Sequence, residues 1–149
     1  MAFHTVLSAS IQGLHVEMVH VEADVSNGLP VFHMVGYLSS EVKEASERVR
    51  TAIRNAGIQI PARKVVVNLA PATVRKKGAS FDLPIALAVM AALGEIEGEK
   101  LERTLVIGEL GLDGRVQEVP GILPMLLEAR KAGCRACILP IRNAPEGAL

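Results

Sequence analysis

Hydrophobic and polar residues alternate over the first third of the chain, which is the pattern of half-buried strands. Residues 5–11 alternate loosely, and residues 14–25 alternate with period two. The hydrophobic frame of the second stretch shifts near Val19, and this shift predicts a bulge or bend. An Asn-Gly pair follows and supplies the positive φ angles of a tight hairpin, so residues 31–35 are expected to form the partner strand.

Further along the chain the hydrophobic spacing becomes helical. Three helices are predicted, each followed by a glycine: residues 40–56, 80–93 and 121–132. Short apolar runs between them predict strands: residues 65–70, 104–107 and 137–139, with a further strand and a tight Asp-Gly turn in 108–116. Because strands come first and then alternate with helices, the predicted fold class is α+β or mixed α/β, with helices packed against a sheet.

Length and composition fit one globular domain. The chain has 149 residues, of which 50% are hydrophobic and 21% are charged. A disordered chain would have fewer apolar residues and a larger net charge. No apolar run reaches the roughly 18 residues of a membrane span, and the N-terminus lacks the basic start and apolar centre of a signal peptide. We therefore expect a soluble, cytoplasmic protein with no membrane contact.

Charge is balanced overall but unevenly distributed. The chain has 16 Lys and Arg residues and 16 Asp and Glu residues, so its net charge is zero. Residues 48–81 contain eight bases and no acid, whereas residues 82–128 contain nine acids and three bases. A basic face of this kind can contact nucleic acid or protein. The alternative is that solvated surfaces of opposite sign simply segregate along the chain.

Most motifs that carry known chemistry are absent from the sequence. It has no P-loop, no dinucleotide-binding fingerprint and no metalloprotease motif. Cys134 and Cys137 form a single C-x-x-C pair, but a structural zinc site needs four ligands and all four histidines lie before residue 34. We therefore expect no metal site and no cofactor in this chain, and we expect both cysteines to be small buried residues.

One local arrangement deserves a chemical interpretation. Ser80 follows a basic loop and a glycine, at the predicted start of a helix. Free N–H groups at a helix start can hold an anion or a developing oxyanion, and a serine there is a nucleophile if a base lies near. The competing interpretation is that Ser80 and Asp82 cap the helix, which is by far the commoner role.

Six groups of short motifs, spread over nearly the whole chain, point to one family. They are Asp24–Pro30; Val35-Gly36; Val42–Glu44 with Glu47–Arg50; Val67–Ala72; Lys77–Ala86; and Gly108–Leu110 with Leu112, Gly114 and Val116. Together they resemble the Lon-protease-like domain that opens the Mg-chelatase-like AAA+ ATPases of the YifB/ComM family. The resemblance implies a fold like that of ribosomal S5 domain 2, a sheet with helices packed on one side.

The resemblance also implies which residues a Lon-type protease would use. Ser80 matches the position of the nucleophile, but the position of the catalytic lysine falls on Leu123, which cannot accept a proton. The carboxylate of Asp82 would in addition repel an oxyanion. We therefore expect no protease activity and no catalytic residue. The alternative is a Ser–Lys hydrolase related to Lon whose base is Lys43 or Lys77; a third hypothesis is an S5-like RNA-binding module.

For the whole protein, the resemblance implies that residues 1–149 form a single accessory domain at the N-terminus of a longer AAA+ ATPase. Family members form hexameric rings, use ATP and Mg²⁺, and act in DNA recombination and competence as branch-migration helicases. The domain would then serve ring assembly and contact with DNA, with its own ATPase module or with neighbouring subunits.

The resemblance gives the basic stretch a specific hypothesis. The best candidates for contact with DNA phosphates are Arg75, Lys76 and Lys77, because they lie together on a predicted loop; Arg63 and Lys64 come next. Zero net charge and only four aromatic residues predict weak, sequence-independent binding that is lost at moderate salt. The competing hypothesis is that the same surface meets another subunit or module.

Overall fold

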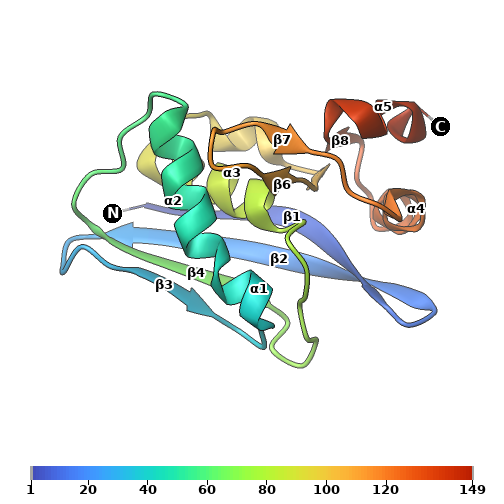
Figure 1. Ribbon diagram of the computed structural model, residues 1–149. Coiled ribbons are helices and arrows are strands. Elements are labelled where there is room, and N and C mark those ends of the chain that lie inside the picture. Colours follow the sequence, from blue (N-terminus) through green and yellow to red (C-terminus); the bar gives the residue numbers. More distant parts are fainter. Residues whose placement is uncertain (1, 149) are drawn as a thin grey trace.

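The computed structural model describes residues 2–148, and its main feature is a mixed six-stranded sheet (Figure 1). The strands are β1 (Ala2–Gln12), β2 (His15–Ser26), β3 (Phe32–Val35), β4 (Lys64–Ala70), β5 (Thr104–Val106), β6 (Glu109–Leu110), β7 (Val116–Gln117) and β8 (Ala136–Ile138). The sheet order is β3-β4-β2-β1-β5-β8, and β6 and β7 form a separate hairpin. β1, β2 and β4 are antiparallel neighbours, whereas β3, β5 and β8 join in parallel.

The three predicted helical segments are confirmed, and one further short helix lies in the C-terminal tail, where none was predicted. The helices are α1 (Ser40–Lys43), α2 (Ala45–Asn55), α3 (Asp82–Leu93), α4 (Ile122–Lys131) and α5 (Ala144–Gly147), with 3-10 turns at Gly98–Leu101 and Ile141–Asn143. The helix predicted over 40–56 is interrupted at Glu44, which separates α1 from α2. The helix predicted from residue 80 starts at Asp82. None of these helices is long and apolar enough to cross a membrane.

The Asn-Gly turn does not produce the predicted hairpin. β3 pairs in parallel with β4 from Phe32↔Val65 to Val35↔Asn68, and β4 lies between β3 and β2 (Figure 1). The expectation that residues 31–35 return against β2 is therefore wrong. The physical reason is length: β4 pairs with the long β2 over seven residues, from His20↔Ala70 to Ser26↔Lys64, and this leaves the short β3 at the outer edge of β4.

The predicted bulge near Val19 is also wrong. β1 and β2 pair without interruption from Ala2↔Val25 to Gln12↔His15. The hydrophobic frame shifts because the two faces of β2 are covered at different places. Val19, Val21, Ala23 and Val25 point into the main core, whereas Val16 and Met18 contact a second cluster.

α2 and α3 pack together on one face of the sheet (Figure 1), which confirms the α+β class and, for these two helices, the packing on one side. Their buried residues meet inward-pointing valines of β2 and β4. α4 packs against the second cluster, which includes Leu105. Because Leu105 and its neighbour Val106 point to opposite faces of β5, and Val106 belongs to the main core, α4 covers the other face at this end of the sheet.

The C-terminal tail, for which the sequence indicates no role, is fixed by one buried side chain. Asn143 donates from its Nδ2 to the carbonyl of Val119 and accepts from the N–H of Val119, both at 2.9 Å. These two hydrogen bonds tie the turn before α5 to the segment that leads into α4.

Candidate functional site

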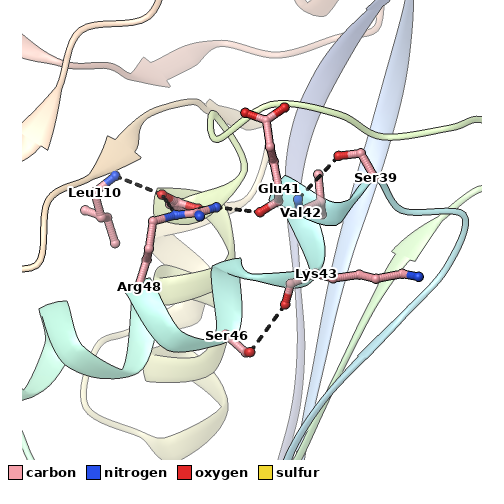
Figure 2. A network of polar contacts seen from close by, with 8 residues as sticks. Ser39, Glu41, Val42, Lys43, Ser46, Arg48 and Leu110 are labelled. Atoms are coloured by element: carbon pink, nitrogen blue, oxygen red, sulfur yellow. Dashed lines mark hydrogen bonds and ion pairs between the residues drawn. The ribbon is translucent and has the colours of Figure 1, made fainter.

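Asp82, at the first turn of α3, is the centre of the arrangement that the sequence indicates near Ser80. Its side chain is 0% exposed and accepts from Arg48 Nε at 2.9 Å and from Arg48 Nη2 at 3.0 Å. A third bond comes from the N–H of Leu110 at 3.1 Å. Figure 2 shows Arg48 reaching from α2 toward this point, where it also donates to the carbonyl of Glu41 at 2.7 Å.

This contact joins three segments that are far apart in the sequence. Arg48 comes from α2, Asp82 from α3 and Leu110 from β6, and each belongs to one of the short motifs described above. Burial raises the pKa of Asp82 above the usual carboxyl range, while the hydrogen bonds from Arg48 and Leu110 oppose this shift. The same contact raises the pKa of Arg48. The bidentate ion pair between Arg48 and Asp82, together with the bond from Leu110, therefore acts as an internal strut: it links α2, α3 and the β6–β7 hairpin in the interior.

The backbone N–H groups at the start of α3 are already occupied. The N–H of Asp82 donates to the carbonyl of Ala79 at 3.2 Å, the N–H of Leu83 donates to the carbonyl of Gly108 at 3.0 Å, and Pro84 has no N–H. The N–H of Gly108 in turn donates to the carbonyl of Ser80 at 3.0 Å. These two amides of the first turn are therefore not available to hold an anion or an oxyanion.

The capping interpretation of Ser80 and Asp82 is wrong as well. Phe81 occupies the position before the helix, and no side chain caps it. Asp82 accepts from Arg48 and Leu110 instead of from an amide of its own helix. Ser80 is half-buried, and its hydroxyl makes no hydrogen bond with another residue of the described range 2–148.

The candidate bases do not contact Ser80 in the structure. Lys43 is exposed, and its side chain points away from Arg48 (Figure 2). Lys77 is also exposed, and within residues 2–148 no hydrogen bond joins either ammonium group to the Ser80 hydroxyl. Leu123, at the position where the resemblance places the lysine, lines a hollow of about 330 Å³ on α4.

The C-x-x-C pair lies in that same hollow. Cys134 and Cys137 are free thiols with intermediate exposure. Burial, and to a lesser degree the neighbouring Cys137, raises the pKa of the Cys134 thiol. A thiol with a raised pKa is a poor nucleophile at neutral pH. The expectation that both cysteines are buried is corrected, because each is only half-buried at the wall of this hollow.

The three basic side chains of the loop after β4 differ in their exposure to solvent. Lys76 is fully buried, and its ammonium donates to the carbonyl of Pro71. Its backbone also bridges to the segment before α1, through the carbonyl of Tyr37 at 2.9 Å and the N–H of Ser39 at 2.8 Å. Burial lowers the pKa of Lys76. The expectation of an accessible Lys76 is therefore corrected, and Arg75 and Lys77 are the exposed cations of this loop.

The second pair of candidates lies at the other end of the same strand. Arg63 and Lys64 are exposed where β4 begins, whereas Arg75 and Lys77 follow its end. β4 itself, seven residues long, spans about 20 Å. Sequence reasoning missed two further arginines, Arg50 and Arg54 of α2, which line a hollow together with Arg63. Their spacing of four residues was the available signal, since it places both on one helix face.

Comparison with known proteins gives consistent similarities. A family model described as "Subunit ChlI of Mg-chelatase" matches residues 21–143. The chain is 39% identical over 149 residues to competence protein ComM of Haemophilus influenzae, which covers 100% of this chain and 29% of that protein. It is 43% identical over 134 residues to the uncharacterised protein YifB of Salmonella typhimurium, which covers 90% of this chain and 26% of that protein.

A more distant similarity connects the chain with proteases. It is 28% identical over 145 residues to the Lon protease of Mycolicibacterium smegmatis, which covers 92% of this chain and 18% of that protein. The chain therefore spans less than a third of the length of each of these relatives.

Proposed function

The chain belongs to the family of subunit ChlI of Mg-chelatase, and we propose that it is a non-catalytic accessory domain of a longer Mg-chelatase-like AAA+ ATPase that processes DNA. In this proposal the domain serves ring assembly and contact with DNA or a partner module. ATP and Mg²⁺ would act in the longer protein and not in this chain.

The main support for a non-catalytic domain is the buried carboxylate of Asp82. It lies two residues after Ser80 in the sequence, and it is held in the interior by Arg48 and Leu110. A fixed carboxylate disfavours an oxyanion nearby. The occupied amides of Asp82 and Leu83 support the same conclusion.

Support for DNA contact comes from the exposed cations at both ends of β4 and from one relative. Arg63, Lys64, Arg75 and Lys77 are exposed, as phosphate contact requires. The relative named competence protein ComM matches the whole of this chain. Support for ring assembly comes from the family resemblance and the length of the relatives, of which this chain is less than a third.

A Ser–Lys hydrolase is the second candidate function, and the similarity to Lon protease is the observation that favours it. Labelling with a serine-directed fluorophosphonate, together with digestion of unfolded casein, decides between the two. We expect neither labelling nor cleavage. Labelling or cleavage by the wild-type chain that disappears in Ser80→Ala would overturn the non-catalytic proposal.

The assembly and DNA parts of the proposal need the longer protein. Its particle mass is measured with and without ATP, and its affinity for a labelled duplex is measured in parallel. The comparison is between the wild type and a form that lacks residues 1–149. We expect the truncated form to assemble less completely or to bind DNA less tightly. Identical assembly and identical DNA affinity in both forms would contradict the accessory role.

A further inference from the structure

A groove between α2 and the start of β4 gathers three arginines that form no ion pair within residues 2–148. Arg50 and Arg54 come from α2, and Arg63 comes from the turn before β4; the hollow between them has a volume of about 340 Å³. Among residues 2–148, none of the three contributes to a salt bridge, and no Asp or Glu lines the hollow. Their positive charge is therefore available to a ligand.

The walls of the groove hold one of these guanidinium groups in place. Arg50 lies over the ring of Phe32 at 5.8 Å from its centroid, a cation–π contact that restricts the side chain. Pro30, Ile60 and Pro61 form apolar walls around it. A guanidinium on a stiff support loses less conformational entropy when it binds an anion than a free lysine does.

The spacing of the arginines suits more than one phosphate group. Arg50 and Arg54 are one helical turn apart, about 6 Å along α2, and Arg63 lines the same hollow from the segment before β4. Lys64, exposed and next to Arg63, extends the positive surface along β4. Guanidinium groups match phosphate oxygens in a bidentate geometry that lysines lack.

The neighbouring surface limits where an anionic chain can bind. Arg63 and Pro61 also line a second hollow, whose far wall is formed by Ala91, Ala92, Leu93 and Gly94. Glu95, exposed directly after Gly94, begins the segment of four acids up to Glu102. An anionic chain would be repelled there, so the Arg50–Arg54 side is the favourable path.

We propose that the Arg50–Arg54–Arg63 groove binds the phosphate groups of a polynucleotide, in preference to the loop that carries Arg75 and Lys77. This inference rests on the proposed contact with DNA and assigns it to one place on the domain. Since only three arginines take part, binding is weak, independent of base sequence and sensitive to salt.

The test measures fluorescence anisotropy of labelled oligothymidine and of a labelled duplex with the full chain over a series of salt concentrations. The groove variant is Arg50→Gln/Arg63→Gln, and the loop variant is Arg75→Gln/Lys77→Gln. The matched control is Arg130→Gln/Arg135→Gln, which removes the same charge from a hollow that also contains Glu146. Urea unfolding midpoints of all variants establish that each one is folded.

We expect the groove variant to bind more weakly, with a salt dependence on oligothymidine that is shallower by about 0.7 in log–log slope for each arginine removed. The loop variant and the control should keep the wild-type slope. Loss in the loop variant alone would overturn the groove assignment and leave the proposed DNA contact standing. Absence of binding by the wild type would overturn both.

Competition experiments identify the chemistry of the ligand. Inorganic polyphosphate should displace the labelled oligothymidine more effectively than polyglutamate at equal charge, because guanidinium forks favour phosphate geometry. Equal displacement by polyglutamate would overturn the phosphate assignment and indicate an acidic protein segment as the occupant. Displacement by free ATP at the same phosphate concentration as polyphosphate would overturn the polynucleotide assignment in favour of a free nucleotide.

Discussion

Arg48 and Arg50 are two residues apart on α2, yet one stabilises the interior and the other faces solvent. The guanidinium of Arg48 meets the fully buried Asp82 at the start of α3. Arg50 lies over the ring of Phe32 and lines the groove with Arg54 and Arg63. Two steps along a helix turn the side chain by about 200°, so a single basic run supplies both an internal strut and an external cationic surface.

Lys76 and Lys77 repeat the same division on the loop after β4. The ammonium of Lys76 is buried against the carbonyl of Pro71, whereas Lys77 is exposed. The eight bases of residues 48–81 therefore overstate the surface charge of this region. A charged residue contributes to a binding surface only where the fold leaves it without an internal partner. Substitutions of the buried and of the exposed charges should therefore differ sharply in their effect on the free energy of unfolding.

The largest effect is expected for Asp82→Ala. The change leaves the guanidinium of Arg48 and the N–H of Leu110 without their partner, so the free energy of unfolding should fall by about 3–5 kcal/mol. Urea denaturation measures it. The control is Asp113→Ala at the exposed pair with Arg115, where the N···O distance is 3.7 Å and the loss should stay below about 1 kcal/mol. Equal losses at both sites would contradict the strut.

A smaller, pH-dependent effect is expected for Lys76→Met. Burial holds the pKa of folded Lys76 below its usual 10.5. Between these two pKa values the unfolded state binds more protons, so the wild type should gain stability as pH rises through this window. Lys76→Met should lack this gain and differ from the wild type by about 1 kcal/mol or less at pH 7. The free energy of unfolding is measured against pH for the wild type, Lys76→Met and the exposed control Lys77→Met. Parallel profiles for the wild type and Lys76→Met would refute the expected gain.

Arg50→Ala should cost less still, because no buried group depends on this side chain. Loss of its contact with the ring of Phe32 should lower the free energy of unfolding by about 0.5–1 kcal/mol. Thermal or urea unfolding detects this difference, and Arg54→Ala, which has no such ring contact, is the matched comparison. A loss as large as that of Asp82→Ala would mean that the groove arginines are structural, and the comparison between the two regions would fail.

The smallest effect is expected for Ser80→Ala. The Ser80 hydroxyl makes no hydrogen bond within residues 2–148, so the change in unfolding free energy should be within about 0.5 kcal/mol. A helix cap would lose about 1 kcal/mol on the same change. A loss of that size, measured by urea denaturation, would indicate that Ser80 caps α3 after all.

The sequence was sufficient for most local elements, but not for the break at Glu44 or for α5. Helical spacing located α2, α3 and α4, and apolar runs located β4, β5 and β8, because these patterns depend on neighbours within a few residues. It was not sufficient for the sheet order. The insertion of β4 between β2 and β3 depends on competition between strands about 40 residues apart, which no local pattern records.

The candidate site was predictable in outline only. The sequence singled out the region around Ser80 as a candidate site, and the family resemblance led to the expectation of no protease activity there. The partner of Asp82 lies 34 residues away on another helix, so the ion pair could not be read from spacing. Lys76 was misjudged because an ammonium in a basic loop is normally solvated, and only its carbonyl partner at Pro71 makes burial tolerable.

The position of β5 in the sheet has a consequence for the nascent chain during translation. β5 joins β1 in parallel, and the hydroxyl of Ser8 donates to the carbonyl of Val106 across 98 positions. A ribosome needs about 5–20 s to add that many residues. During that interval β1 can already pair with β2 while its other edge presents unsatisfied N–H and C=O groups. The nascent domain thus passes through a stage in which its central sheet is open to pairing with other chains.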